Sequence, residues 1–412
     1  MLIQNLKWQV FFGAAMASAC WLHYNAELYP QAALLGAAGL WGLFGPVPFL
    51  RGKTLHGSAR WASRDDVKAR GLLGTKGVII GKLAGRFGGL DARFLRFDAP
   101  GHLATFAPTR SGKGAGQIIP TLLTYPGSVF VTDVKRENYD ITAAYRRDVL
   151  KQDVLKIDPN DAKNSIVFNP LDAVRREPQY LATDAGMLAD MMIARNQKGG
   201  GNSEHFEQQA YMVIKGFVMY VIQEHPDSAD MAMVRRLLTA SEKDLNATCK
   251  DMTECPNIDI AAVGNHLLSL SDREKSSVMS TVKGKTEIWS DRQVMAVTSG
   301  KSEIDFRDLK DRNISLYMVI PPEQLDYYKQ FMRVVVGMAL RAMTQNKKQP
   351  AHPVLFLLDE FPALGTMSPV SNAVGVAAGY GVRLWLFCQS MAQLEQHYGR
   401  EEAENFIGNC TV

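Results

Sequence analysis

The chain has 412 residues, of which 46% are hydrophobic and 21% are charged, so we expect a globular protein and exclude a largely disordered one. At this length, two domains with a small appendage are expected. The formal net charge of +4 does not by itself indicate nucleic-acid binding, which also requires clustered basic residues, and the five cysteines follow no zinc spacing.

The first fifty residues differ in character from the rest of the chain. Residues 8–24 and 31–50 contain no Asp, Glu, Lys or Arg, and each is about as long as the roughly 17–25 residues of a membrane-spanning helix. Lys7 precedes the pair and Arg51 follows it, whereas the link between them lacks Lys and Arg. The positive-inside rule therefore predicts a transmembrane hairpin over residues 1–52, with both ends and the bulk of the protein in the cytoplasm.

Two other interpretations of this region stay open at this point. A cleaved signal peptide could end near the small residues Ala17, Ser18 and Ala19, with Cys20 as a site of lipid attachment. Alternatively, the two apolar segments could form a helical pair that packs on the rest of the protein.

A phosphate-binding loop is predicted at residues 107–116, APTRSGKGAG. An apolar strand is predicted before it at 102–107 and an apolar helix after it, which is the setting that makes such a loop credible. Its backbone N–H groups would bind an anion, and Lys113 would reach the β- and γ-phosphates of a nucleotide. The predicted nucleotide-binding residues are Ala107, Pro108, Thr109, Arg110, Ser111, Gly112, Lys113, Gly114, Ala115 and Gly116.

Two positions of this loop depart from the pattern GxxxxGK[ST]. Ala107 replaces the first Gly, and Gly114 replaces the Ser or Thr whose hydroxyl usually binds Mg²⁺. A Gly-rich turn that merely ends a strand is therefore the alternative. A second motif elsewhere in the chain is needed to support a nucleotide-binding site.

That second motif is predicted at residues 354–360, VLFLLDE. Five apolar residues indicate a strand buried on both faces, as in a parallel sheet, and acidic residues at its carboxyl end lie where open α/β sheets bind ligands. Asp359 is predicted to hold Mg²⁺ through water, and Glu360 to orient and deprotonate the attacking water. If the apolar run and its two acidic residues are considered without the phosphate loop, an acidic turn at the surface is the alternative.

Further strands are predicted at 382–388, 128–133 and 314–320. The first of these ends at Gln389, which could contact the γ-phosphate or the attacking water, or could simply be a polar strand end. The predicted catalytic residues are Lys113, Glu360 and Gln389. Strands that alternate with helical stretches indicate an α/β fold, a RecA-like P-loop nucleotide-binding domain.

The middle of the chain, residues 176–298, has little strand signal and shows helical periodicity, so we predict an inserted all-α domain there. Lys275, Lys283 and Lys285 lie in one polar stretch of it, either as a solvated helix face or as a DNA contact. The predicted nucleotide-binding domain is split into residues 53–175 and 299–412, the second part apparently truncated.

The order of several sequence blocks resembles the TraG-type coupling proteins of conjugative and type IV secretion systems, over nearly the whole chain. The blocks are HGSARWAS at 56–63, APTRSGKGAG at 107–116, VTDVKREN at 131–138, FNPLD at 168–172, LLDEFPALG at 357–365 and CQSMAQLEQHYG at 388–399. In that family a Gly after the loop Lys is usual, so Gly114 fits the resemblance.

The resemblance implies an inner-membrane ATPase that uses ATP and Mg²⁺ and assembles as a ring, a hexamer. It would receive a DNA–relaxase complex or an effector protein and deliver it to the channel proteins of a type IV secretion system. The inserted helical domain would recognise that substrate. The family's membrane helices are usually joined by a longer external loop, and its nucleotide domain continues beyond residue 412.

Two other functions remain as alternatives at this point. One is a DNA-translocating motor of the FtsK type, and the other is a membrane receptor or assembly scaffold that binds nucleotide without turnover. Arg136 and Arg383 are candidates for an arginine that a ring would supply to a neighbouring site.

Overall fold

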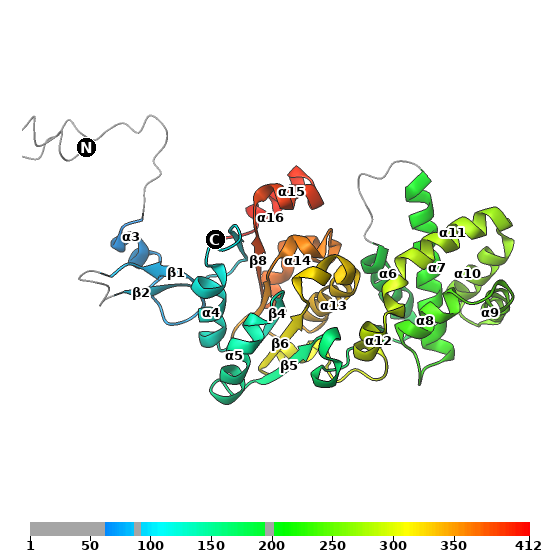
Figure 1. Cartoon of the computed structure of the whole chain (residues 1–412), viewed down its shortest axis with the longest axis horizontal. Helices are drawn as coiled ribbons and strands as arrows, with labels where there is room; N and C mark the ends of the chain where they lie inside the picture. Colours follow the sequence, from blue (N-terminus) through cyan, green and yellow to red (C-terminus); the bar gives the residue numbers. More distant parts are fainter. Residues whose placement is uncertain (1–61, 86–91, 194–201) are drawn as a thin grey trace, which may run out of the picture. The chain divides into compact units, whose positions relative to one another are not determined.

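A computed structural model describes residues 62–85, 92–193 and 202–412. Residues from Val67 onward belong to one unit, which is built on a six-stranded sheet in the order β3-β8-β7-β4-β6-β5 (Figure 1). Every neighbouring pair in this sheet is parallel. The strands are β3 (Leu103–Phe106), β4 (Val129–Asp133), β5 (Asp153–Ile157), β6 (Ile314–Val319), β7 (Val354–Leu358) and β8 (Val382–Cys388). The predicted α/β class with a parallel sheet is confirmed.

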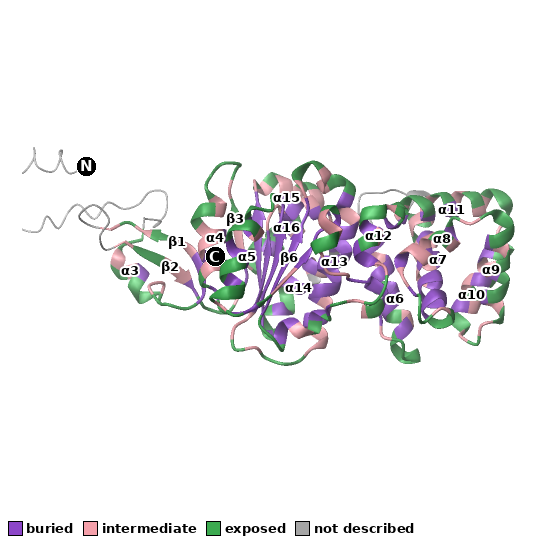
Figure 2. Ribbon diagram, turned by 60° about the horizontal axis from the view of Figure 1, so that its bottom comes forward, coloured by how far each residue is buried: buried purple, intermediate pink, exposed green. Residues whose placement is uncertain are grey.

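The inner strands form because their sequences are apolar runs that can be buried on both faces. Every residue of β4, β6, β7 and β8 is buried, and Figure 2 shows these strands as a continuous buried layer. The edge strands β3 and β5 are only partly buried. This gradient is what a sheet covered by helices on both faces requires.

Helices cover both faces of the sheet (Figure 1). Because side chains alternate along a strand, Val129 and Val131 share a core with Leu122 of α4, whereas Phe130 belongs to the core that contains α13. The helices of the sheet domain are α4 (Ile119–Thr124), α5 (Glu137–Asp148), α13 (Leu325–Gln345), α14 (Ser368–Val376), α15 (Met391–Tyr398) and α16 (Arg400–Gly408).

The described residues between β5 and β6 contain helices and no strand. The helices are α6 (Pro178–Ile193), α7 (Asn202–Glu224), α8 (Met231–Leu238), α9 (Glu242–Glu254), α10 (Ile258–Ser269), α11 (Asp272–Lys285) and α12 (Arg292–Thr298). The polar stretch with three lysines is thus part of α11. The predicted domain limits of 53–175, 176–298 and 299–412 stay predictions.

One asparagine ties together the two chain segments that connect the helices to the sheet. Asn169, in the FNPLD block, donates from Nδ2 to the carbonyl oxygens of Ala229 (2.7 Å) and Gly300 (3.0 Å). Its backbone N–H donates to Ser302 Oγ at 2.9 Å. Because the Asn169 side chain is almost fully buried, its polar atoms depend on these bonds. The bonds hold the chain where it enters the helical segment next to the chain where it leaves that segment.

A small antiparallel sheet precedes the main one in sequence. It consists of β1 (Val78–Leu83) and β2 (Arg93–Phe97), and the short helix α3 (Arg64–Ala69) comes before it. Buried Val78 and Phe97 join the core of α4, which anchors this small sheet to the domain of the six-stranded sheet.

The predicted membrane localisation requires a correction. Within residues 62–85, 92–193 and 202–412, no helix combines the length and the apolar character needed to cross a bilayer. The structure therefore does not support the predicted multi-pass inner-membrane arrangement. The predicted segments 8–24 and 31–50 lie outside the described residues.

Candidate active site

The register of the parallel sheet brings the predicted site residues to one edge. Phe106, the last residue of β3, pairs with Cys388, so the predicted phosphate loop begins beside Gln389. Leu358 pairs with Leu386 of β8, which places the following acidic pair on the other side of the same strand end. The carboxyl ends of β3, β8 and β7 thus converge, as expected for a ligand site in an open α/β sheet.

Three charged side chains meet at this edge. Lys113 Nζ lies 2.7 Å from Asp359 Oδ1 and 3.6 Å from Glu360 Oε2. The three side chains are 21%, 17% and 18% exposed, so they are largely packed yet reachable from solvent. The structure therefore brings together the lysine and both carboxylates that the sequence assigned to one site.

The backbone holds Glu360 in a sparsely populated conformation. Its φ of 54° and ψ of 47° are left-handed, which costs a non-Gly residue about 1–2 kcal/mol. Its N–H donates to Asp359 Oδ1 at 3.1 Å, and Thr132 Oγ1 donates to the Asp359 carbonyl at 2.9 Å. Such strain, fixed by neighbouring bonds, is typical of a residue whose side chain is aimed for function.

Gln389 is the fourth member of the cluster. Its Nε2 donates to Glu360 Oε1 at 3.0 Å, so the amide fixes one carboxylate oxygen while the other faces Lys113. Gln389 is itself held because its backbone N–H donates to Gln393 Oε1 at 3.1 Å. Sequence reasoning missed Gln393, although Ser390 and Gln393 have the spacing of a helix-capping box and Ser390 Oγ accepts the Gln393 N–H.

The predicted phosphate loop leaves β3 and turns directly into a helix. Ala107 N–H donates to the carbonyl of Cys388 at 2.9 Å, which ties the start of the loop to β8. Arg110 and Gly112 have φ values of 63° and 83°, and the tight turn they make precedes the π-helical turn Gly114–Ile118 that continues into α4. All ten predicted loop residues lie in this strand–loop–helix unit, whose geometry suits anion binding by backbone N–H groups.

The donor set at this edge fits a magnesium ion that is shared with phosphate groups. Within residues 62–85, 92–193 and 202–412, no group of three or more His, Cys, Asp or Glu side chains could hold a metal ion. Mg²⁺ commonly binds through one or two carboxylates, water and the phosphates of its substrate. Asp359, beside the loop, is the carboxylate in position for that mode.

Asp133, the last residue of β4, is buried next to this site. Burial raises its pKa to about 6, and the nearby charge of Asp359 acts in the same direction. Backbone N–H groups oppose the shift, among them that of Tyr139, which donates to Asp133 Oδ2 at 2.7 Å. Asp133 therefore organises the turn into α5 rather than facing Lys113.

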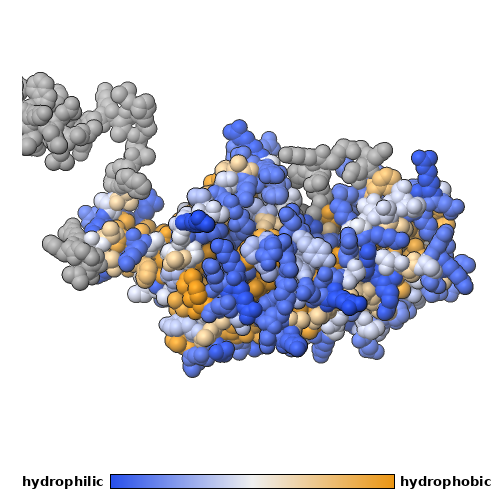
Figure 3. All heavy atoms as spheres, in the orientation of Figure 1, coloured by the Kyte–Doolittle hydropathy of each residue, from blue (hydrophilic) through white to orange (hydrophobic). Residues whose placement is uncertain are grey.

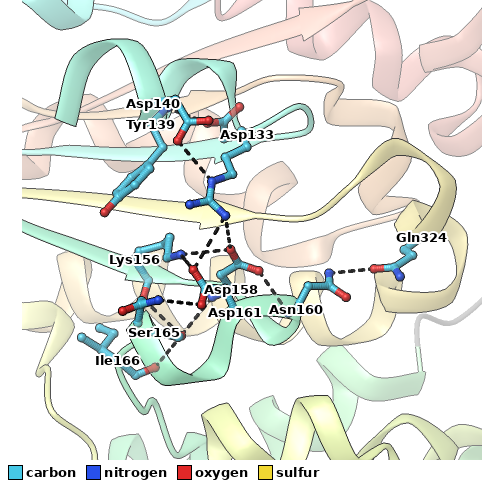
Figure 4. A network of polar contacts seen from close by, with 12 residues as sticks. Asp133, Tyr139, Asp140, Lys156, Asp158, Asn160, Asp161, Ser165, Ile166 and Gln324 are labelled. Carbon is cyan, nitrogen blue, oxygen red and sulfur yellow. Dashed lines mark hydrogen bonds and ion pairs between the residues drawn. The ribbon is translucent and has the colours of Figure 1, made fainter.

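A separate polar network lies at the end of β5 and the start of α5 (Figure 4). The buried ammonium of Lys156 lies 3.2 Å from Asp158 Oδ2 and 2.6 Å from Asp161 Oδ2. Arg136, the residue that precedes α5, joins the network because its Nη1 lies 3.9 Å from Asp158 Oδ2 and 3.7 Å from Asp161 Oδ2. Its Nε also donates to Asp140 at 3.1 Å, and its side chain is 44% exposed. The network explains how a lysine is buried at the end of a strand.

The two candidate arginines differ in how far they can reach. The Arg383 side chain lies in β8, where the residue is 2% exposed and Nη2 donates to the carbonyl of Ala99 at 2.7 Å. It is therefore enclosed within its own chain. Arg136 remains the exposed one of the two.

Comparisons with known proteins agree with this geometry. Residues 60–412 match the family described as type IV secretory system conjugative DNA transfer. The chain is 30% identical over 394 residues to the conjugal transfer protein TraG of Escherichia coli, covering 87% of this chain and 61% of that protein. It is 28% identical over 374 residues to the protein VirD4 of Rhizobium radiobacter, covering 88% and 53%. The chain thus spans about half to three-fifths of these relatives' lengths.

Solved structures share the fold. The plasmid coupling protein TrwB in complex with the non-hydrolysable ATP analogue ADPNP has a TM-score of 0.59 at 15% identity, over 75% of this chain and 68% of that one. An unbound form of the same coupling protein gives a TM-score of 0.58 over 75% and 66%. At this level of identity, the likeness concerns the fold alone.

Proposed function

Because the chain belongs to the family of type IV secretory system conjugative DNA transfer proteins, we propose that it is the ATP-hydrolysing part of a coupling protein. The observation that carries this proposal is the convergence of Lys113, Asp359 and Glu360 beside the phosphate loop. The bound nucleotide would be ATP with Mg²⁺. The solved complex of the coupling protein TrwB with ADPNP supports this choice.

Lys113 would stabilise the charge of the phosphate groups. Its ammonium sits at the start of the helix that follows the loop, where backbone N–H groups also favour an anion. A fixed cation aimed at the transferring phosphoryl group lowers the barrier because it need not reorganise during the reaction. The two carboxylates that now hold Lys113 would keep its side chain aimed at that point.

Glu360 would accept the proton of the attacking water. A general base must lie within hydrogen-bond reach of that water, and the left-handed backbone directs this carboxylate to the loop side of the strand ends. Gln389 would fix one carboxylate oxygen through its 3.0 Å bond, leaving the other for the proton.

Asp359 would hold the metal ion, through water. Mg²⁺, when bound, neutralises the phosphate oxygens and the developing charge. Asp359 also receives the Glu360 N–H, so the position of one carboxylate fixes the backbone of the other.

Hydrolysis would drive delivery of a substrate to a type IV secretion channel. The substrate would be a DNA–relaxase complex or an effector protein, the helices α6–α12 would recognise it, and six copies would form a ring. The tie that Asn169 makes between Ala229 and Gly300 supports this division of labour, because it connects the helical segment rigidly to the sheet. An FtsK-like motor and a scaffold without turnover are the competing functions.

Replacing Lys113 by Ala tests the proposal. Phosphate release from ATP by the full chain should fall to background, whereas Lys163→Ala, at an exposed lysine distant in sequence from the loop, should retain normal turnover. The melting temperatures of both variants report whether each is folded. Normal phosphate release by a folded Lys113→Ala protein would contradict the proposal, and nucleotide binding without hydrolysis by the unaltered protein would favour the scaffold.

A further inference from the structure

A cleft lies where the helical segment meets the helices of the sheet domain. Residues of α6 and α7 line it on one side, and residues of α13 and α14 line it on the other. Its volume of about 600 Å³ is within the range of roughly 300–1,000 Å³ that is usual for sites enclosing a small molecule. The lining contains no residue of the candidate active site, so the cleft is a separate feature of the protein.

A glycine on α6 brings two side chains of α7 to this cleft. A Cβ added to Gly186 would lie 2.6 Å from the Tyr211 hydroxyl and 3.8 Å from Lys215 Cδ. Because Gly186 has no side chain, Tyr211 and Lys215 can lie directly over α6. Both line the cleft, which thus receives one ammonium group and one aromatic ring from α7.

Most of the other lining side chains are apolar. Met187 of α6 and Val376 of α14 are 45% and 53% exposed, and Leu340 of α13 is buried. Figure 3 shows hydrophobic residues scattered among hydrophilic ones over the visible face of the protein, so exposure alone does not single out a binding site. This place differs because apolar residues of three helices line one cavity.

One cation of the lining has no counter-charge. Lys215 is half-buried, and no carboxylate, including that of Asp190 in the same lining, pairs with its ammonium in the part of the chain that the structure describes. Arg341, the other cation of the lining, forms an ion pair with buried Asp184. Attraction between charges is screened less beside apolar surface than in bulk water, so the Lys215 ammonium favours an anion within the cleft.

We propose that this cleft binds a small amphiphilic anion, a molecule with an apolar body and one acidic group. The body would pack among Met187, Leu340 and Val376, and the acidic group would pair with Lys215. Burial of apolar surface would supply most of the affinity, and the single ion pair would orient the molecule, as in small-molecule sites that place few polar groups in an apolar lining. Binding there does not depend on the proposed ATP hydrolysis.

A matched pair of dyes tests the acidic group and the apolar body separately. Anilinonaphthalene sulfonate carries a sulfonate on an apolar ring system, and phenylnaphthylamine is the same ring system without the sulfonate. Fluorescence titration of the full chain should show one saturable site for the sulfonate dye. Lys215→Met removes the charge and keeps an unbranched side chain, so it should weaken binding of the sulfonate dye about tenfold or more, the usual effect of losing a hydrogen bond between charged groups. Binding of the neutral dye should stay unchanged.

Three further variants serve as controls. Lys215→Arg retains a cation and should retain affinity for the sulfonate dye. Ala182→Phe, which fills the cleft from α6, should weaken binding of both dyes. Lys163→Met, at an exposed lysine that does not line the cleft, should leave both affinities unchanged. Melting temperatures confirm that each variant is folded.

Several results would overturn the inference. They are the absence of a saturable site for the sulfonate dye, an unchanged affinity for it in folded Lys215→Met, and an equal loss of both dyes in that variant. Loss of the sulfonate dye in Lys113→Ala but not in Lys215→Met would place the dye at the phosphate loop instead. Dye binding that disappears as the protein concentration rises would show that a second copy of the chain covers the cleft. Phosphate release is measured in parallel, so failure of the ATPase proposal is recognised separately.

Discussion

Gln389→Ala isolates one hydrogen bond of the candidate active site. The Gln389 amide donates to a charged carboxylate oxygen of Glu360 at 3.0 Å, and hydrogen bonds to charged groups contribute about 1.5–3 kcal/mol. If the bond aims Glu360 at the attacking water, its loss should appear in the barrier to hydrolysis. Tenfold in rate corresponds to about 1.4 kcal/mol, so kcat should fall by about 10- to 150-fold.

Affinity for ATP should change little in this variant, because Lys113 and Asp359 remain in place. The assay is steady-state phosphate release beside equilibrium binding of a fluorescent ATP analogue. Gln393→Ala, which removes only the acceptor of the Gln389 backbone N–H, should have a smaller effect of the same kind. A kcat within twofold of normal would refute the reasoning, and an affinity loss as large as the kcat loss would show that Gln389 acts in binding.

Two further predictions concern stability. Arg333 is 7% exposed and donates to the carbonyls of Met191 and Met192 at the end of α6. Arg333→Met should therefore lower the free energy of unfolding by about 2–5 kcal/mol. Urea titrations measure this change, and an unchanged unfolding midpoint would contradict the prediction. The pKa of Asp133, raised to about 6 by burial, means that the folded state holds this proton more tightly than the unfolded chain, so its contribution should be lost as pH rises from about 4 to about 6. Relative to Asp133→Asn, the stability of the unaltered protein should fall by about 2 kcal/mol between pH 4 and pH 6, and a constant difference would show that Asp133 does not titrate there.

The inner strands could be predicted from sequence because parallel strands buried on both faces are continuous apolar runs. The edge strand β5 could not, since its sequence DVLKI breaks the run with Lys156. That lysine is buried only because Asp158 and Asp161, which follow the strand, compensate its charge. The strand therefore forms through contacts between residues that are far apart in sequence, and no local sequence pattern predicts those contacts.

The sequence was enough to predict which charged residues form the candidate site, but not how their backbones are arranged. Motif spacing placed Lys113 and Glu360 in one site because parallel strand ends share an edge. The left-handed backbone of Glu360 and the bond from Thr132 to the Asp359 carbonyl depend on the register of β4 against β7, which sequence spacing does not specify.

Lys113, Asp359 and Glu360 are proposed to hydrolyse ATP with divided roles. The most direct measurement is ATP affinity beside ATP turnover in Glu360→Gln, an isosteric change that removes the base and keeps the side-chain shape. Binding should remain close to normal while hydrolysis slows by about 10²- to 10⁴-fold, the usual contribution of a general base. Asp359→Asn, in contrast, should weaken Mg²⁺-dependent binding as well as turnover. Normal hydrolysis by a folded Glu360→Gln protein, or an equal loss of binding in both variants, would contradict the account.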